Sequence, residues 1–386
     1  MSDTPFLPYG RQSIDDDDIQ AVTRVLRSDY LTTGPEIAAF EEELCAYTGA
    51  KYAVAVSNGT AALHLAVLAL ELPVGSIGIT SPNTFVATSN ALVYAGHTPL
   101  FVDIDPKTYV MDPTALAESM DGRKAQVVLP VHFAGHTAGV EEVSRIARKH
   151  SAYVIEDAAH SLGGRYLDRC RVGSCSHSDM TTFSFHPVKT MTTGEGGAIT
   201  TNDPELYRRL MTLRTHGITR DPDRLTQNPG HWYYEMQMLG FNYRMTDFQA
   251  ALGRTQLQKL DRFVNRRREL VARYNQAFGN VPWLTTPWEE SGRETAWHLY
   301  VLQFDWNAVG MDRPTVMAKL RDQGVGTQVL YIPVPDQPYY HENYPDAGAL
   351  VSNARHYYEH VLAIPLYPGL SDADHARVIE TIQGLV

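Results

Sequence analysis

Residues 183 to 197 read Phe183-Ser184-Phe185-His186-Pro187-Val188-Lys189-Thr190-Met191-Thr192-Thr193-Gly194-Glu195-Gly196-Gly197. This segment contains one lysine and no arginine, and most of the neighbouring residues are aromatic, hydroxyl-bearing or glycine. A lysine in such surroundings is poorly solvated, and loss of solvation lowers the pKa of the ammonium group. The free amine is the nucleophile that Schiff-base chemistry requires, so Lys189 is a candidate catalytic residue. A lysine that extends from a strand end to solvent is the simpler alternative.

Short apolar runs alternate with amphipathic helical patterns between residues 50 and 200. The runs that we interpret as buried strands are 52–56, 77–80, 100–104, 127–132, 153–156 and 181–185. This alternation predicts an α/β fold with a mostly parallel sheet covered by helices. Ligands of such sheets bind beyond the carboxyl ends of the strands, so polar residues that follow the strands are candidate site residues.

The chain has 386 residues, which favours two domains over one compact core. We place a large domain at residues 1–250 and a smaller C-terminal α/β domain at residues 251–386. A long helix enters the smaller domain, because Thr246 and Gln249 have the spacing of a capping box and the pattern continues to Phe278. The following segments that we interpret as a strand, a helix and a strand are 299–304, 314–323 and 326–332.

The sequence also indicates where a first helix begins and where a long loop lies. Ser13 precedes a run of acids, 15–18, and we interpret Ser13 as the N-cap of a first helix with those acids in its first turn. Residues 215–240 form a long loop rich in proline, glycine and aromatic residues. A loop of this length is usually functional or lies at a subunit contact.

Composition excludes several classes of function. The formal net charge is −11, and the basic run at 266–268 lies in a helical pattern beside an acid, so a nucleic-acid-binding surface is not expected. Three cysteines without CxxC spacing indicate neither a disulfide framework nor a zinc site. No secretory signal pattern or membrane-length apolar run is visible, so we expect a cytoplasmic protein that does not enter a membrane. His132 and His136 are separated by a glycine-containing break and lack a third ligand, so we expect no metal site.

Three polar motifs follow predicted strands. The segment 57–60, Ser-Asn-Gly-Thr, opens a helix and can serve either as a phosphate cup or as an ordinary cap. Phe85 lies in the next motif, 83–88, as a stacking surface or a core residue. Asp157 emerges from an apolar strand and needs a cationic partner if it is buried. Asp103 and Asp105 also follow a strand, and spacing alone does not rank the three acids.

Taken together, these motifs resemble the aminotransferases of the DegT/DnrJ/StrS family, which are pyridoxal 5′-phosphate (PLP) enzymes of fold type I acting on nucleotide-linked keto-sugars. The resemblance covers essentially the whole chain and is closest to the C4 aminotransferases of pseudaminic acid biosynthesis. The segments that carry it are 183–197, 213–222, 240–245 and 328–333. The first and third of these are the most specific.

The resemblance implies a role for each candidate residue. Lys189 matches the lysine that forms a Schiff base with PLP and then transfers a proton. The positions that match cofactor contacts are Gly59, Thr60 and Ser184 at the phosphate, Phe85 on the ring face, Asp157 at the pyridinium nitrogen, His160 near the ring hydroxyl, and Asn242 offered from a second subunit. The positions that match the sugar-nucleotide site are Tyr9, Asp29, Tyr30, Leu31, Thr32 and Tyr331.

The resemblance also implies a reaction and partners. We expect a homodimer with shared active sites that uses an amino acid donor, glutamate, to aminate C4 of a UDP-linked 4-keto-6-deoxy-HexNAc. The alternatives are amination of another nucleotide-linked keto-sugar at C3 or C4, and a sugar-nucleotide-sensing regulator without turnover. The related sugar dehydratases need histidine where Lys189 stands. The chain departs from the closest subfamily at residues 57–60. That subfamily usually has Asn-Ser-Ala-Thr at these positions, whereas this chain has Ser-Asn-Gly-Thr.

Overall fold

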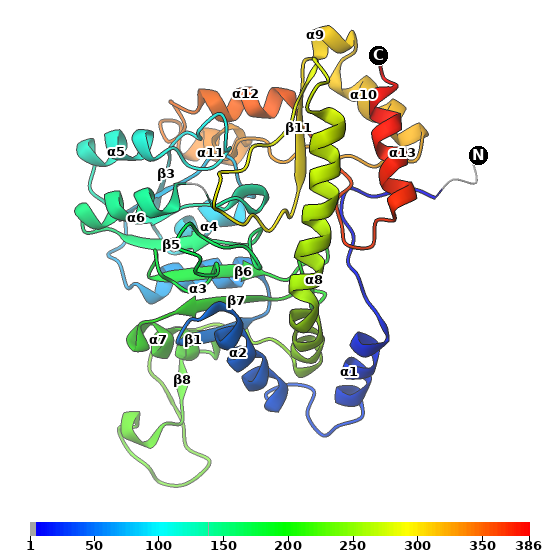
Figure 1. The fold of residues 1–386 in the computed structure, drawn as a ribbon. Coiled ribbons are helices and arrows are strands. Elements are labelled where there is room, and N and C mark those ends of the chain that lie inside the picture. The colour runs from blue at the N-terminus through cyan, green and yellow to red at the C-terminus, as the bar shows by residue number, and fades with distance from the viewer. Residues whose placement is uncertain (1–4, 138) are drawn as a thin grey trace.

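A seven-stranded sheet forms the centre of the computed structural model, which describes residues 5–137 and 139–386 (Figure 1). Its strands are β1 (Tyr52–Val56), β2 (Ile77–Thr80), β3 (Thr98–Phe101), β4 (Ala125–Leu129), β5 (Tyr153–Asp157), β6 (Met180–Ser184) and β7 (Gly197–Thr201). The strand order is β1-β7-β6-β5-β4-β2-β3, and β7 alone runs antiparallel to its neighbours. The predicted mostly parallel α/β sheet is therefore confirmed, although β7 was not recognised in the sequence.

Helices cover both faces of this sheet. On one face lie α3 (Gly59–Ala69), α4 (Ala87–Tyr94) and α7 (Pro204–Arg214), and on the other α2 (Pro35–Thr48), α5 (Pro113–Gly122) and α6 (Val140–Lys149). Successive strand residues point to opposite faces, so Val54 and Val56 pack with α3 while Ala53 and Ala55 pack with α2. Both faces are apolar because both are covered.

Helix α8 (Asp247–Phe278) links the sheet to the C-terminal part of the chain. Its predicted capping box is confirmed, as is its end at Phe278, and Gly279 is the C-cap. Helix α1 (Asp16–Leu26) packs on α8. The prediction of Ser13 as its N-cap was wrong: Asp15 is the N-cap and forms a capping box with Asp18, so the acids supply both partners of the box.

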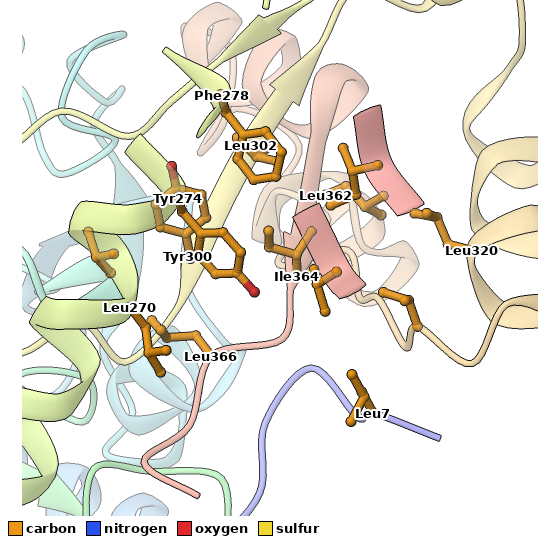
Figure 2. Close-up of a cluster of buried hydrophobic side chains, with 14 of the residues drawn as sticks. Leu7, Leu270, Tyr274, Phe278, Tyr300, Leu302, Leu320, Leu362, Ile364 and Leu366 are labelled. Carbon is orange, nitrogen blue, oxygen red and sulfur yellow. The ribbon is translucent and has the colours of Figure 1, made fainter. Parts of the chain in front are cut away.

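The C-terminal part contains a second, antiparallel sheet. Its strands are β10 (Leu284–Thr285), β11 (Tyr300–Phe304) and β12 (Val361–Ile364), and its helices are α9 (Trp306–Val309), α10 (Arg313–Asp322), α11 (Pro338–Asn343), α12 (Ser352–His360) and α13 (Asp372–Gln383). Figure 2 shows its core, where Tyr274 of α8 meets Tyr300 of β11 and Ile364 of β12, with Leu7 joining from the N-terminal segment. The division into domains at residues 250 and 251 stays a prediction, and α8 crosses it.

The expected strand at 326–332 is absent from the described structure. Only Gln328 forms a bridge there, with Ala363 of β12, and the chain then turns toward the large sheet. Three short 3₁₀ helices complete the fold: η1 (Phe133–Gly135), η2 (Pro222–Arg224) and η3 (Val334–Asp336).

The long loop predicted at 215–240 is a projecting arm (Figure 1). Two short strands, β8 (Ile218–Thr219) and β9 (Glu235–Met236), pair at its base. Large apolar side chains remain exposed on this arm: Trp232 at 71%, Met236 at 61% and Leu239 at 78%. Exposed apolar side chains gathered on one projecting segment are typical of a contact with another surface.

Arg267 of α8 is fully buried, and its guanidinium is one of the main links between α8 and the C-terminal part. One terminal nitrogen donates to the carbonyl oxygens of Trp297 (3.2 Å), His298 (3.1 Å) and Leu366 (2.7 Å). Burial lowers the pKa of Arg267 to about 10, so the group stays charged at neutral pH.

We expect Arg267→Met to lower the free energy of unfolding by about 3 kcal/mol, because it leaves these buried carbonyl oxygens without a donor. Arg262→Met is the matched control, since the Arg262 side chain is 69% exposed. Urea unfolding of both variants measures the difference. Equal stability of the two variants would contradict the role given to Arg267.

Candidate functional site

A cavity of about 1000 Å³ opens at the carboxyl ends of β1, β2, β5 and β6. The candidate residues that line it are Tyr9, Gly59, Thr60, Phe85, Asp157, His160, Ser184, Lys189 and Tyr331. They come from segments far apart in the sequence and meet because parallel strands present their carboxyl ends at one edge of the sheet. The structure therefore brings most of the predicted site together.

Lys189 lies in the connection between β6 and β7, which pair side by side in antiparallel fashion. The connection is closed at its base, where Phe185 N–H donates to the Gly196 carbonyl oxygen (2.8 Å). Within it, the Thr192 hydroxyl donates to the Phe185 carbonyl oxygen (2.9 Å). These bonds hold the lysine at the cavity wall.

The surroundings of Lys189 shift its protonation equilibrium toward the neutral amine. Desolvation lowers the pKa of the Lys189 amine to about 8, and the Asp157 carboxylate partly opposes that shift. The side chain is only partly accessible and borders the cavity. With a pKa of about 8, roughly one amine in ten is unprotonated at pH 7, far more than at the ordinary lysine pKa, and this neutral form is the nucleophile.

Asp157 ends β5 and is 6% exposed. Its Oδ2 accepts a hydrogen bond from the Thr88 hydroxyl (2.6 Å), and its Oδ1 accepts one from Ala159 N–H (3.2 Å). No lysine or arginine forms an ion pair with it in the described part of the chain, although it is buried. A buried carboxylate of this kind can receive a cationic ligand group from the cavity.

The other two strand-end acids have structural roles. Asp103 accepts hydrogen bonds from the backbone N–H groups of Asn353 (2.8 Å) and Ala354 (3.0 Å) at the start of α12. Asp105 accepts from the Thr108 N–H (2.7 Å) in a turn. Neither lines the cavity, so the structure separates Asp157 from the two acids that resembled it in sequence.

The segment 57–60 forms a tight cup against β6. Asn58 caps α3, accepting from Ala61 N–H (2.8 Å). A Cβ atom on Gly59 would lie 2.8 Å from the Ser184 Cβ, so only glycine permits this approach. Thr60 and Ser184 border the same space. A helix N-terminus with two hydroxyl groups beside it suits a phosphate.

Aromatic and imidazole groups form the opposite wall. Phe85 is 57% exposed where it faces the cavity, and its ring lies 6.1 Å from that of Tyr331. Ala134 N–H donates to His160 Nδ1 (3.3 Å), which places the imidazole proton on Nε2, 3.4 Å from the Tyr331 hydroxyl. Desolvation, assisted by Lys189, moves the pKa of His160 well below its ordinary value, so it is a neutral donor.

Several candidate residues lie away from this cavity. Asp29, Tyr30, Leu31 and Thr32 form an exposed connection between α1 and α2. Asn242 forms a backbone bridge with Thr215, while its neighbours Phe241 and Tyr243 do border the cavity. A single chain does not bring these residues to Lys189, and their assigned roles stay predictions.

The site also contains groups that the sequence did not single out. Thr84 and Thr88 line the cavity, and the Thr88 hydroxyl contacts Asp157. Both belong to the 83–88 motif, and their spacing of four residues at a helix start was the available signal. His298 lies behind His160, with ring centroids 4.3 Å apart. No local pattern marked His298.

The two histidines considered as metal ligands have other contacts. His132 Nε2 lies 2.9 Å from a Glu156 carboxylate oxygen, and its Nδ1 lies 2.7 Å from the Ser161 hydroxyl. The His136 ring stacks on Trp288, with centroids 6.0 Å apart. The two side chains therefore face different partners.

The chain is similar to known proteins along nearly its whole length. The model of the DegT/DnrJ/EryC1/StrS aminotransferase family matches residues 12–383. The spore coat polysaccharide biosynthesis protein SpsC of Bacillus subtilis is 41% identical over 382 residues, covering 99% of this chain and 97% of SpsC.

Two solved structures are similar along their whole length. Helicobacter pylori PseC, an aminotransferase involved in the biosynthesis of pseudoaminic acid, has a TM-score of 0.90 and 29% identity, with 98% of this chain and 99% of PseC covered. The PLP form of Spr1654 from Streptococcus pneumoniae has a TM-score of 0.89 and 28% identity, with 98% of each chain covered. Fold type I and PLP as the expected cofactor follow from the family and these structures.

The residues present fit PLP. The cup at 57–60 with Ser184 suits its phosphate, Asp157 is a buried carboxylate that lacks a cationic side-chain partner among the described residues, and Lys189 offers a poorly solvated amine. The cavity of about 1000 Å³ leaves room for a second ligand beside the cofactor.

We expect PLP to attach to the apoprotein at Lys189, at a rate that reaches half its maximum near pH 8. The neutral amine is the nucleophile, so the rate rises with pH up to the pKa and then levels off. Stopped-flow absorbance measures the rate, and borohydride reduction with peptide mapping locates the pyridoxyl label. A label on another lysine, or a midpoint near the ordinary lysine pKa, would contradict this assignment.

Proposed function

The chain belongs to the DegT/DnrJ/EryC1/StrS aminotransferase family, and we propose that it aminates C4 of a UDP-linked 4-keto-6-deoxy-HexNAc, with glutamate as the donor. The chain is a PLP-dependent sugar aminotransferase; the identity of the sugar, the nucleotide and the donor is the proposal. The observation that carries it is the Lys189 amine held beside buried Asp157 in a cavity large enough for two ligands. The likeness to PseC along the whole chain supports the choice of sugar.

Three residues of the cavity, Lys189, Asp157 and His160, would each have a separate role in the reaction. PLP, when bound, supplies an electron sink for the carbon that gains or loses the amino group. Lys189, with a pKa of about 8, can both accept and release a proton near neutral pH. Asp157 would lie at the ring nitrogen and stabilise a positive charge there. His160, whose Nε2 lies 3.4 Å from the Tyr331 hydroxyl, would donate to the ring hydroxyl.

A second copy of the chain would complete each site. Asn242 and the segment 29–32 lie outside the cavity of their own chain, and the projecting arm at 215–240 carries exposed Trp232, Met236 and Leu239. Contacts of these segments with a second copy would cover the exposed apolar side chains. We therefore propose a homodimer with shared active sites.

Among the described residues, no helix has the length and apolar character needed to cross a membrane. We also propose a cytoplasmic location, because the proposed substrates, a nucleotide-linked sugar and glutamate, are metabolites of the cytoplasm.

A second candidate is amination of a different nucleotide-linked keto-sugar. Its support is SpsC, which shares 41% of its sequence with this chain and acts in spore coat polysaccharide biosynthesis by its name. The cup at 57–60 also differs from that of the pseudaminic acid subfamily. A regulator without turnover is disfavoured, because a sensor would not need the reactive Lys189 amine.

We expect the purified enzyme to convert UDP-4-keto-6-deoxy-HexNAc and glutamate to an aminated sugar. Mass spectrometry of a panel that varies the nucleotide, the keto position and the stereochemistry ranks the substrates. Lys189→Ala is the matched negative control, which should show no product because the proton-transferring amine is gone. Preference for a C3-keto or a thymidine-linked sugar would replace the proposed substrate with the second candidate.

We expect Asn242→Ala to weaken PLP retention without dissociating the dimer, because the amide would be offered to the partner's cofactor. Mixing Lys189→Ala with Asn242→Ala chains should restore activity, since one of the two sites in each hybrid dimer is intact. The recovery is measured as the activity of the mixed variants after subunit exchange, compared with the activity of each variant alone. Absence of recovery in verified hybrids would refute shared sites.

A further inference from the structure

Two threonine hydroxyl groups and the Asp157 carboxylate form a continuous series of hydrogen bonds in the wall of the cavity. Thr84 Oγ1 lies 2.7 Å from Thr88 Oγ1, and Thr88 Oγ1 lies 2.6 Å from Asp157 Oδ2. The three side chains are buried, with 3%, 0% and 6% exposure respectively. Little of these side chains is exposed to solvent, although all three border the cavity.

The direction of each bond follows from counting protons. An ionised carboxylate can only accept, so Thr88 donates its single hydroxyl proton to Asp157. Thr88 can then only accept from Thr84, which makes Thr84 the donor at the far end. The Phe85 carbonyl oxygen also lies 3.3 Å from the Thr88 hydroxyl, but the contact to the carboxylate is shorter and charge-assisted.

The hydrogen bond from Thr88 fixes the position of one oxygen of the Asp157 carboxylate, Oδ2. Ala159 N–H contacts the other oxygen at 3.2 Å, a longer bond than that from Thr88. No lysine or arginine pairs with Asp157 within the described ranges, so the Thr88 hydroxyl is its shortest described contact. Removing that donor would leave one oxygen of a buried carboxylate without its partner.

We propose that Thr88, oriented by Thr84, is a positioning residue that holds the Asp157 carboxylate in the orientation in which it would meet the ring nitrogen of the cofactor. The inference rests on the role proposed above for Asp157. The same short segment carries Phe85, so one turn between β2 and α4 sets both the stacking surface and the orientation of the carboxylate. This coupling explains why polar side chains occupy fully buried positions at the start of α4.

The test compares Thr88→Val, Thr88→Ser and Thr84→Val in the full-length protein. Valine has nearly the shape of threonine and lacks the hydroxyl, whereas serine keeps the donor. We expect Thr88→Val to weaken PLP binding roughly 10- to 100-fold, the usual cost of losing a bond to a charged group. Thr88→Ser should restore most of the affinity, and Thr84→Val should cause a smaller loss, because it acts through Thr88.

A second measurement is independent of activity. The ¹⁵N chemical shift of ring-labelled PLP reports whether the ring nitrogen carries a proton. We expect the shift in Thr88→Val to move toward that of the unprotonated ring, and the shift in Thr88→Ser to stay near that of the wild type. Circular dichroism of the apoprotein verifies that each variant is folded.

Asp157→Asn separates the failure of this inference from the failure of the proposed function. If Asp157→Asn changes the ¹⁵N shift and the affinity but Thr88→Val changes neither, the positioning role of Thr88 is overturned while the role of Asp157 stands. If Asp157→Asn itself leaves both unchanged, the assignment of Asp157 fails and the role of Thr88 fails with it. Equal losses in Thr88→Ser and Thr88→Val would also overturn it, because the hydroxyl would not be responsible.

Discussion

The site depends on keeping one amine and one carboxylate poorly solvated in the same cavity. Burial alone would drive both groups to their neutral forms. No carboxylate among the described residues forms a hydrogen bond with Lys189, and the pKa of its amine falls to about 8. Asp157, in contrast, accepts hydrogen bonds from the Thr88 hydroxyl and the Ala159 N–H. An amine that readily loses its proton and a hydrogen-bonded carboxylate thus line the same cavity.

Strand β7 is what holds the lysine in place. In an entirely parallel sheet, the chain leaving β6 would cross to the far end of the sheet before pairing again. Because β7 returns antiparallel beside β6, residues 185–196 form a closed connection at the carboxyl edge. Gly197, which pairs with Ser184, lies close to Asn58 of the cup, so a single hairpin brings the lysine and the phosphate-binding segment together.

The C-terminal part supports this edge from behind. Arg267 of α8 binds the carbonyl oxygens of Trp297 and His298, and the His298 ring packs against His160. Tyr331, from the irregular segment that was expected to be a strand, reaches the same histidine. A helix shared by both parts of the chain therefore connects the core in Figure 2 with the wall of the cavity.

Local chemistry in the sequence was enough to identify most of the strands, α8 with both its ends, and the cavity residues whose neighbours are unusual, such as Lys189 and Gly59. Spacing along the chain could not rank Asp157 above Asp103, because both are acids that follow apolar strands, and only the resemblance to a family singled out Asp157; in the structure their tertiary partners differ. It could not recognise β7, since antiparallel insertion depends on which strand lies beside it, nor Thr88, whose role exists only where β5 and α4 meet. Periodicity and composition act along the chain, whereas the ionisation, orientation and exposure of a side chain are decided by groups that are distant in sequence and adjacent in space.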